Sequence, residues 1–411
     1  MANENAFIDY DVIVIGAGPG GSACASFCAI KGLKTLLVDK QKFPREKICG
    51  DALSGKSIEV LEKLDLIKDI EKQQHAYIKS IIFSGPNGKE VEISFEKEKG
   101  DYHGYCIKRI YSDNVIYQKA KKLCDTIEEF EVIDLKYEKE FVEVIGLDKK
   151  TNSQKAFKAK LVVGADGAYS KVAKINGLDK IEYEHHCTAL RTYFSNVKGN
   201  NKEHAIELHF VEEAIPGYFW IFPVGNNEWN VGIGMITKDM QERRVNLKDV
   251  LMKVIESEKF KERFKDAKMI DSIKGWTLPF GSKKRKMYSY RTMLVGDAAQ
   301  LIDPFTGEGQ GNALVSGLIA SEVAKMANKK NDFSEEFLKI YNEKVYETLW
   351  NELNTSYQLQ KMSKFKWLLN FVISKAAKSE KVRETITSML SGRKPKNHLF
   401  NPLFYIELLF S

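Results

Sequence analysis

Three aspartates stand close behind apolar runs, where their carboxylates could bind a polar ligand. They are Asp39, Asp166 and Asp297, and the runs are residues 35–38, 161–164 and 292–295. Short apolar runs bounded by a turn are typical of buried parallel strands. A carboxylate at the end of such a strand can accept hydrogen bonds from the hydroxyl groups of a ribose or ribityl chain. Taken alone, Asp166 or Asp297 is also compatible with an ordinary turn at a strand end.

A glycine-rich segment precedes the first of these acids. It follows the apolar run 11–15, opens a helical pattern over 19–31, and reads Gly16-Ala-Gly18-Pro19-Gly20-Gly21. In this spacing Gly16 permits a tight turn, Gly18 lets the backbone approach a pyrophosphate, and Gly21 lets the helix pack on the strand. The helix start favours an anion through its free N–H groups and its dipole. With Asp39 ending the next strand, the segment predicts a dinucleotide-binding βαβ unit, and the alternative is a plain glycine-rich turn.

An aromatic segment lies near the middle of the chain. Tyr218, Trp220 and Phe222 share one face of an expected strand. Pro223 ends that strand because it has no N–H to donate to a neighbour. Stacked rings can hold an isoprenoid chain through contact area, with little polar recognition. The alternative is that these rings are ordinary sheet core.

A return strand is expected directly after the aromatic segment. Residues 225–227 have turn chemistry, and residues 229–235 read as the partner strand. Gly232 and Gly234 fall on one face of it. Two missing side chains beside large rings predict an apolar trough.

The remaining elements alternate between two kinds of pattern. Helical spacing is expected over residues 55–74, 113–124, 308–327 and most of 333–411. Strand patterns are expected over residues 78–98, 130–147 and 187–280. Because antiparallel segments separate the buried parallel strands along the chain, the two domains must be interleaved.

Composition excludes several classes of protein. The 411 residues are 43% hydrophobic and 29% charged, which is typical of globular chains long enough for two domains. A net charge of +7 is too small and dispersed to indicate nucleic acid, but it suits a phosphorylated cofactor or an anionic lipid. The chain has neither a secretory signal pattern nor an apolar run long enough to span a bilayer. A cytoplasmic protein is therefore expected.

Cysteines and histidines give no metal-site pattern. The six cysteines are expected to be reduced thiols, with the first two in a helix core: Cys24, Cys28, Cys49, Cys106, Cys124 and Cys187. His185 and His186 adjoin, but no acid or cysteine stands at ligand spacing. We expect both to be solvated loop histidines.

The order of three motifs resembles a known group of flavoproteins. GxGxxG at 16–21, GADG at 164–167 and GDAA at 296–299 occur in this order in FAD-dependent oxidoreductases similar to p-hydroxybenzoate hydroxylase. The resemblance covers about residues 8–327. It implies FAD in an extended form, with the GxGxxG glycines and Asp39 at the ADP end. It also implies Asp166 near the pyrophosphate and Asp297 at the ribityl chain.

The same resemblance implies further cofactor contacts. Arg109, four residues before Asp113 at the entry to a helix, matches the group's cofactor-contacting arginine, and the alternative is a surface charge at a helix start. The other residues predicted to bind the cofactor are Pro19, Gly20, Lys40, Arg45, Cys49, Gly50, Asp51, Ala52, Gly167, Gly296, Pro304, Gly307, Glu308, Gly309, Gln310 and Gly311. No metal is predicted.

Two segments resemble the geranylgeranyl reductase family within this group. Residues 43–52, with Cys49-Gly50, resemble that family's CG segment, and residues 218–223 resemble its Y-x-W-x-F-P box. Gln300 and the run 310–312 depart from the family pattern. The resemblance implies that reduced flavin transfers a hydride to carbon–carbon double bonds of a polyprenyl lipid or quinone side chain. It also implies that Tyr218, Trp220, Phe222 and Pro223 bind this substrate.

Cys49 and Gly50 are the catalytic candidates, since the family has this loop beside the isoalloxazine. An isolated alkene has no carbonyl to take up charge. Hydride addition to one carbon must therefore be matched by protonation of the other. The Cys49 thiol could donate or relay that proton or shape the pocket, and the alternative is a structural cysteine.

Two rival functions stay open. One is an FAD-dependent aromatic monooxygenase or halogenase-like enzyme, although Tyr218 and Phe222 stand where halogenases usually carry Trp and Ile. The other is a non-catalytic flavin- or lipid-binding protein. Because no second GxGxxG occurs, electrons are expected from a transiently docking NAD(P)H or from an electron carrier.

Together these patterns predict an α/β fold. A Rossmann-type FAD-binding domain is interleaved with an antiparallel β-sheet substrate (cap) domain, and a helical region follows. The expected boundaries are 1–75, 101–186 and 281–330 for the first domain, 76–100 and 187–280 for the second, and 331–411 for the third. In the last region the apolar segments 367–373 and 399–410 either meet a membrane surface or pack on the cap.

Overall fold

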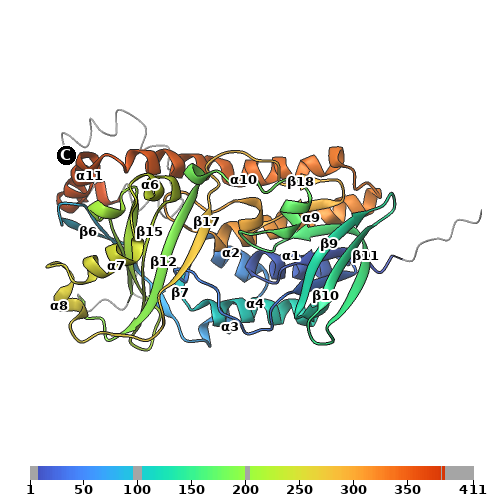
Figure 1. Cartoon of the computed structure of the whole chain (residues 1–411), viewed down its shortest axis with the longest axis horizontal. Coiled ribbons are helices and arrows are strands. Elements are labelled where there is room, and N and C mark those ends of the chain that lie inside the picture. The colour runs from blue at the N-terminus through green and yellow to red at the C-terminus, as the bar shows by residue number, and fades with distance from the viewer. Residues whose placement is uncertain (1–7, 96–103, 200–203, 381, 385–411) are drawn as a thin grey trace, which may run out of the picture.

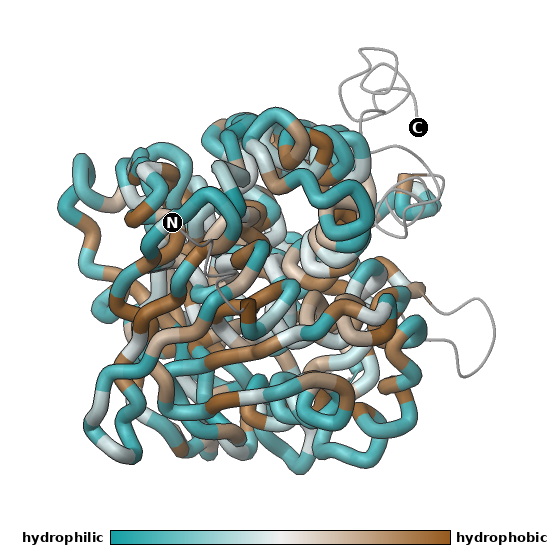
Figure 2. The backbone as a smooth tube through the Cα atoms, turned by 90° about the vertical axis from the view of Figure 1, so that its right-hand side faces the viewer, coloured by the Kyte–Doolittle hydropathy of each residue, from teal (hydrophilic) through white to brown (hydrophobic). Residues whose placement is uncertain are grey.

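The computed structural model describes residues 8–95, 104–199, 204–380 and 382–384. Two large β-sheets lie along the long axis of the molecule, and the long helix α10 (Glu335–Met362) runs over both (Figure 1). Seen end-on, apolar segments gather in the interior while hydrophilic loops mark the outside (Figure 2). Among the described residues, none of the helices is both apolar enough and long enough to cross a membrane. The predicted apolar segment 399–410 lies outside the described residues.

The first sheet is built around β1 (Tyr10–Ile15), whose residues Val12–Ile15 are buried. Its parallel neighbours, in order outward, are β11 (Ser153–Gly164) and β19 (Thr292–Leu294) on one side, and β2 (Thr35–Asp39) and β8 (Asp125–Glu128) on the other. Antiparallel strands complete it: β9 (Phe130–Tyr137), β10 (Val142–Asp148) and β18 (Tyr288–Ser289). Ile15 pairs with Val38 and with Gly164, so the turns after these strands leave at one edge.

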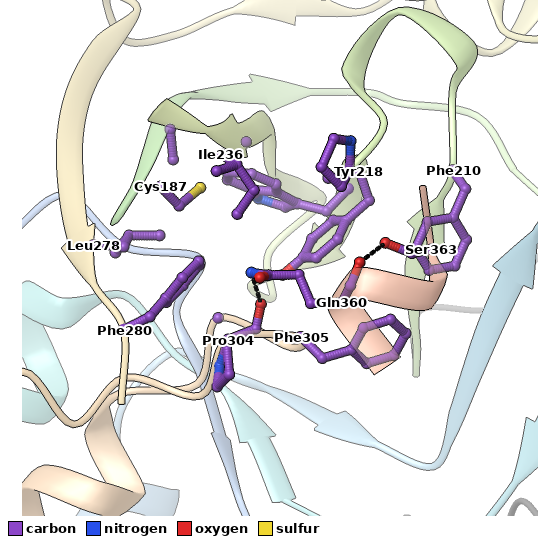
Figure 3. Close-up of a pocket in the computed structure, with 16 residues that line it drawn as sticks. Cys187, Phe210, Tyr218, Ile236, Leu278, Phe280, Pro304, Phe305, Gln360 and Ser363 are labelled. Atoms are coloured by element: carbon purple, nitrogen blue, oxygen red, sulfur yellow. Dashed lines mark hydrogen bonds between the residues drawn. The ribbon is translucent and has the colours of Figure 1, made fainter. Parts of the chain in front are cut away.

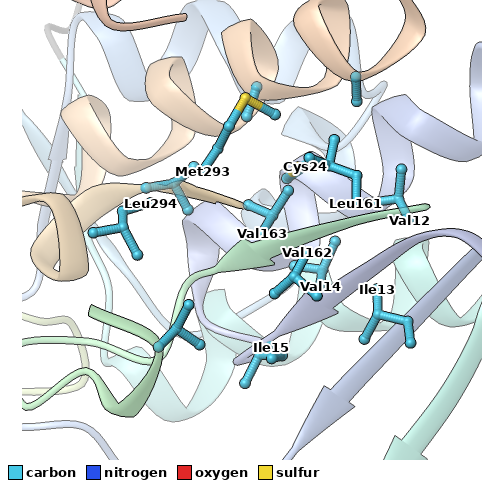
Figure 4. Close-up of a cluster of buried hydrophobic side chains, with 14 of the residues drawn as sticks. Val12, Ile13, Val14, Ile15, Cys24, Leu161, Val162, Val163, Met293 and Leu294 are labelled. Carbon is cyan, nitrogen blue, oxygen red and sulfur yellow. The ribbon is translucent and has the colours of Figure 1, made fainter. Parts of the chain in front are cut away.

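Buried aliphatic side chains on these strands form the largest core cluster (Figure 4). The helices that pack against it are α1 (Pro19–Ile30), α4 (Arg109–Leu123), α5 (Lys171–Ile175), α9 (Gln310–Lys330) and α10. Helices α1 and α9 meet at their backbones, because a Cβ on Gly317 would lie 2.4 Å from the Gly20 carbonyl oxygen. The predicted core positions of Cys24 and Cys28 are confirmed, since neither is exposed.

The second sheet is the predicted antiparallel one. Its order is β16 (Lys268–Met269), β12 (His186–Ser195), β15 (Glu228–Ile236), β14 (Gly217–Pro223), β13 (Ala205–His209), β5 (Ser80–Ser84) and β6 (Glu90–Ser94), with β17 (Lys274–Pro279) also on β12. The pairing of β5 with β13 is parallel. Helices and 3₁₀ turns flank it: α6 (Thr237–Glu242), α7 (Leu247–Ile255), α8 (Lys261–Phe264), Tyr183–His185 and Glu212–Ala214.

A small third sheet connects the two large ones. It consists of β3 (Ala52–Ser54), β7 (Gly104–Cys106) and β4 (Ala76–Ile78). The single helix expected over 55–74 is wrong, because two short helices occur instead, α2 (Lys56–Lys63) and α3 (Ile67–Glu71). Asp65 adopts a left-handed φ of 55°, and the Leu66 N–H bonds the Leu61 carbonyl, which closes the first helix.

The C-terminal helices confirm the helical pattern where they are described. Ser334 caps the start of helix α10, since its side chain accepts a hydrogen bond from the Phe337 N–H. Helix α11 (Lys366–Lys378) buries Ile373 and Ala376 in a cluster with strand β6. The α/β fold class, with mixed sheets and a helical C-terminal region, is confirmed, whereas the exact domain boundaries stay a prediction.

Candidate functional site

One continuous cavity of about 560 Å³ lies between the carboxyl edge of the first sheet and the inner face of the second. The segments around residues 16, 166 and 297 all line it, although they are far apart in the sequence. The predicted site residues that line it are Gly16, Gly18, Pro19, Gly20, Asp39, Lys40, Arg45, Cys49, Gly50, Asp51, Ala52, Arg109, Asp166, Gly167, Tyr218, Trp220, Phe222, Gly296, Asp297, Gly307, Glu308, Gly309 and Gln310. Those outside its lining are Gly21, Gly311, Pro223 and Pro304.

The glycine-rich loop has the geometry that its spacing predicts. Gly16 has a φ of 101°, and a Cβ there would lie 2.4 Å from the Ala165 carbonyl oxygen. A Cβ on Gly21 would lie 1.8 Å from the Gly16 oxygen, so this glycine lets α1 pack close to β1. The Cα of Gly18 instead faces the cavity, where the nearest atom to an added Cβ is Arg45 Nη2 at 3.5 Å. This open side, at a helix start with no side-chain cap, fits the pyrophosphate of a dinucleotide.

Asp39 and Asp166 stabilise the turns on which they stand. Asp39 Oδ2 accepts a 2.7 Å hydrogen bond from the Ala17 N–H, and its other oxygen accepts from the Gln41 N–H at 2.8 Å. Asp166 accepts hydrogen bonds from the Ser170 hydroxyl and the Lys171 N–H, at 2.5 and 2.6 Å, at the start of α5. Both Asp39 oxygens and Asp166 Oδ1 keep a second lone pair that a ligand hydroxyl or water could use, whereas Asp166 Oδ2 also accepts from the Val172 N–H at 3.1 Å. The predicted sugar contact of Asp39 stays a prediction.

Asp297 lies in a 3₁₀ turn, Gly296–Ala299, where the first sheet meets α9. A Cβ on Gly309 would stand 3.5 Å from its Oδ1, so the two predicted loops adjoin. Gly311 faces α2, because a Cβ there would lie 3.2 Å from the Lys56 Cβ and 3.3 Å from the Ser57 hydroxyl oxygen. Helix α9 therefore packs on α2 at Gly311.

Arg109 is not a surface charge. It is only 7% exposed and forms two hydrogen bonds to Asp113, at 2.6 and 2.8 Å, while Arg45 donates to the same carboxylate at 3.1 Å. Burial would lower the pKa of Arg109, but the Asp113 carboxylate and the adjacent Cys49 raise it above its ordinary value. A fixed cation therefore stands at the cavity beside the predicted catalytic thiol.

The Cys49-Gly50 loop lies between this cation and the aromatic segment. Gln310 Nε2 lies 3.7 Å from the Cys49 sulfur, within hydrogen-bond range of a thiol. A Cβ on Gly50 would stand 3.3 Å from the Phe222 ring, so the loop backbone packs directly on that ring. The sequence interpretation missed Lys47 in this loop. Burial lowers the pKa of Lys47 to about 8, and its Nζ lies 3.7 Å from the centre of the Trp276 ring.

The aromatic segment has the predicted shared face. Tyr218 and Trp220 have ring centroids 6.1 Å apart, and Trp220 and Phe222 have centroids 6.3 Å apart. The predicted trough at Gly232 is wrong, because a Cβ there would lie 2.2 Å from the Trp220 ring. The indole fills the space that the missing side chain leaves.

Gly234 does open a space. It lines an apolar pocket of about 40 Å³ beside Tyr218, with Cys187, Ile236 and Leu278 on one side and Gln360 of α10 on the other (Figure 3). Gln360 Nε2 donates to the Pro304 carbonyl at 2.7 Å, which ties α10 to the loop before α9. Pro304 therefore belongs to this smaller pocket rather than to the main cavity.

An apolar arm of the main cavity escaped the sequence interpretation. It follows strands β5, β13 and β14, and its side chains are Ile81, Phe83, Ile206, Leu208, Phe210 and Phe305. Alternation along 81–83 and 206–208 was a usable signal, since residues of one parity share a face. The parallel pairing that joins these strands carries no local signal.

The adjacent histidines also differ from expectation. His185 and His186 are 6% and 4% exposed, so they are not solvated. His185 Nδ1 forms a 2.7 Å hydrogen bond with the Ser282 hydroxyl. Burial lowers the pKa of His186 to about 4, which keeps this ring neutral at physiological pH.

Known proteins share this architecture. A family model described as FAD binding domain matches residues 9–343. The digeranylgeranylglycerophospholipid reductase of Methanocaldococcus jannaschii is 34% identical over 86% of this chain and 88% of its own length. The enzyme of that name from Methanosarcina acetivorans is 33% identical over 84% of this chain and 81% of its own.

Solved structures agree with the fold. A geranylgeranyl bacteriochlorophyll reductase-like protein from Thermoplasma acidophilum aligns with a TM-score of 0.82 and 26% identity, covering 95% of this chain and 98% of its own. A flavin-dependent brominase aligns with a TM-score of 0.77 at 20% identity, covering 97% of this chain and 99% of its own. At that identity the brominase supports the fold alone.

Proposed function

This chain belongs to the geranylgeranyl reductase family of FAD-dependent oxidoreductases, and we propose that it saturates carbon–carbon double bonds in the polyprenyl chains of an isoprenoid glycerophospholipid. The observation that carries the proposal is the apolar arm of the cavity, which leads along the second sheet to the Cys49 loop. A prenyl chain matches such an arm because it is recognised by contact area rather than by polar groups. The names of the relatives favour a glycerophospholipid over a quinone side chain.

The cofactor would lie along the carboxyl edge of the first sheet. Gly16, Gly18 and Asp39 would hold the ADP end, where the open side of Gly18 provides room for phosphate. Asp166 would lie near the pyrophosphate, and Asp297 would accept from the ribityl chain. Bound FAD, once reduced, supplies a hydride to one carbon of the double bond.

Cys49 would complete the addition by delivering a proton from Sγ to the other carbon. The alkene gains one hydride and one proton, and the sulfur is left as a thiolate that water reprotonates. Gln310 Nε2, 3.7 Å from the sulfur, and the buried Arg109 guanidinium would stabilise that thiolate. With a prenyl chain in place, the Tyr218, Trp220 and Phe222 side chains would exclude water from the double bond.

An anaerobic assay tests the function. Chemically reduced holoenzyme is mixed with a digeranylgeranylglycerophospholipid, with geranylgeranyl diphosphate or with a menaquinone, and products are measured by mass spectrometry. The proposal expects a gain of two hydrogen atoms for each bond reduced, with the glycerophospholipid preferred. Product that gains oxygen, and only in air, would instead indicate a monooxygenase or halogenase-like enzyme. Reduced flavin that reacts with none of these would indicate a binding protein.

Electrons would come from a transiently docking NAD(P)H or from an electron carrier. The chain has one GxGxxG, and the family resemblance assigns it to FAD. Anaerobic titration of the oxidised holoenzyme with NADPH separates the two sources: bleaching of the flavin absorbance indicates direct reduction, and its persistence indicates a separate carrier.

The C-terminal region would meet a membrane surface. At the start of α11, Phe365 and Trp367 are 56% and 68% exposed, next to Lys361, Lys364 and Lys366. Exposed aromatic rings among cationic side chains are typical of interfacial contact with anionic lipid. Co-sedimentation with phosphatidylglycerol vesicles is expected to weaken in F365A/W367A. Alanine in place of the exposed Ile30, on α1, is the matched control, and equal binding by both variants would contradict the proposal.

A further inference from the structure

A buried hydrogen-bond network lies beneath the Cys49 loop and joins it to the second sheet. Asp51 Oδ2 accepts from the Tyr193 hydroxyl at 2.6 Å and from Asn230 Nδ2 at 2.8 Å. The same Asn230 nitrogen donates to the Cys49 carbonyl oxygen at 2.6 Å, and Asn230 Oδ1 accepts from Trp220 Nε1 at 2.8 Å. The network therefore touches both the thiol-bearing loop and the aromatic segment.

Asn230 is the residue that joins the Cys49 loop to the aromatic segment. Its side chain is completely buried on β15, directly opposite Phe222 of β14. An Asn amide offers two N–H donors and one carbonyl acceptor, and here the nitrogen serves the loop while the oxygen serves the indole. No aliphatic side chain of similar size could make these three bonds.

Asp51 holds an unfavourable conformation within this network. Its φ is 70°, a left-handed value that disfavours side-chain-bearing residues, and its carboxyl group is fully buried. Burial raises the pKa of Asp51, although Tyr193 and Asn230 oppose that shift through hydrogen bonds. Oδ1 is a buried atom without a hydrogen-bond partner among the described residues. The hydrogen bonds from Tyr193 and Asn230 offset part of the cost of this conformation and of burying the carboxyl group.

The charged groups around Asp51 come from several elements. Arg191 on β12 is 2% exposed, stacks on Tyr193 at 4.3 Å and pairs with Asp271 at 2.6 Å. Lys108 Nζ lies 4.5 Å from the centre of the Tyr193 ring. Lys108 pairs with Glu228 at 2.6 Å, whereas Arg191 and Arg109 attract the Asp51 carboxylate and offset part of the cost of its burial.

We propose that Asn230, with Asp51, is a positioning residue that fixes the Cys49 loop relative to Trp220. Through this link, the proton donor and the prenyl-binding ring keep one separation and one orientation. The proposal rests on the proposed function, in which Cys49 delivers a proton to a bond held by the aromatic segment. Asn230 itself contacts neither reacting carbon nor cofactor in this role.

The test compares Asn230→Leu with Thr188→Val in FAD-loaded protein. Thr188→Val removes a 2.9 Å hydrogen bond between the half-buried Thr188 of β12 and Thr237 of α6, so it controls for the loss of a polar contact elsewhere on the second sheet. For Asn230→Leu, kcat for the glycerophospholipid is expected to fall roughly 10- to 100-fold. KM is expected to change by less than about threefold, because the apolar arm is untouched. The flavin absorbance spectrum should match wild type.

A second readout does not depend on turnover. Iodoacetamide alkylation of each cysteine, followed by mass spectrometry, is expected to show a faster reaction at Cys49 alone in Asn230→Leu. The five other cysteines report any general loosening. If wild type fails to reduce the lipid, the proposed function is wrong, and alkylation alone then decides the positioning proposal.

Two results would overturn the positioning role. One is a kcat for Asn230→Leu within about threefold of the Thr188→Val value. The other is alkylation that rises equally at all cysteines, which would indicate a purely structural contact. If Asn230→Leu does not retain FAD, Tyr193→Phe replaces it, since that change removes one hydroxyl group from the same network and expects the same pattern with a smaller amplitude.

Discussion

Replacement of Cys49 by alanine tests the proton-transfer chemistry most directly. The substitution removes one sulfur from a half-buried position that lines the cavity, so it leaves the fold and the FAD-binding turns intact. If Sγ supplies the proton, the variant should bind FAD and lipid normally yet reduce the double bond slowly.

The size of the effect follows from what surrounds the sulfur. A positioned general acid contributes about 10²- to 10⁴-fold to a rate. Gln310 Nε2 lies 3.7 Å from Sγ, and Arg109 stands beside it, so both could orient a water where the sulfur was. Because such a water would partly replace the thiol as a proton donor, we expect the rate effect to lie at the lower limit of this range. We expect kcat to fall about 100-fold, which corresponds to about 2.7 kcal/mol in the activation barrier.

Single-turnover mixing measures this step. Reduced wild type, Cys49→Ala and Cys124→Ala are each mixed anaerobically with lipid, and flavin reoxidation is followed by absorbance. Cys124 is the matched control, since it is a half-buried thiol that donates to the Ala120 carbonyl at 3.3 Å at the end of α4 and does not line the cavity. Equal rates in all three proteins would remove the thiol from the mechanism.

Three changes elsewhere have defined outcomes. Gly18→Val fills the open side of the cofactor loop, so the variant should keep wild-type circular dichroism but purify without flavin. Asp113→Ala leaves the buried Arg109 guanidinium unpaired, so the free energy of unfolding in urea should fall by about 3–5 kcal/mol. Burial would raise the pKa of Glu207, but hydrogen bonds from Arg263 help lower it to about 2 from 4.5. This stabilisation is complete above about pH 4.5 and is lost as pH falls toward 2, by about 3 kcal/mol in total.

Each of these predictions can be contradicted by a defined result. Flavin retained by Gly18→Val would mean that the loop does not face the pyrophosphate. An unchanged unfolding midpoint for Asp113→Ala would mean that water already screens the arginine. Below about pH 4.5, the free energy of unfolding should fall more steeply with decreasing pH in wild type than in Glu207→Gln. Superimposable curves would assign acid unfolding to other carboxyl groups.

The cofactor side of the fold was predictable because its signals are local. Short apolar runs such as 11–15 and 161–164, bounded by glycine turns, favour buried strands, and the turns that follow them contain the glycines and acids that define the site. Gly21 was assigned correctly because its steric reason is local: a Cβ there would lie 1.8 Å from the Gly16 oxygen. Gly16 was assigned correctly because the tight turn requires its φ of 101°, although the atom nearest to an added Cβ belongs to the distant Ala165.

The substrate side was less predictable because its geometry depends on contacts between distant strands. The apolar arm needs β5 beside β13, a pairing of residues 80–84 with 205–209 that neither segment indicates. Gly232 was misassigned because its open side depends on which way the Trp220 ring turns. The histidines were misassigned because burial of His186 depends on β17, which joins β12 only in the folded sheet.

The parallel pairing of β5 with β13 also constrains when this protein can fold during synthesis. β5 leaves the ribosome long before residues 205–209 have been synthesised. Its apolar face therefore stays exposed until β13 is available to pair with it. The third acid-bearing turn, at Asp297, arrives later still, so no cofactor slot is complete until about three quarters of the chain has been made. FAD is therefore expected to bind only after most of the chain has been synthesised, and not to direct the folding of an early part of the chain.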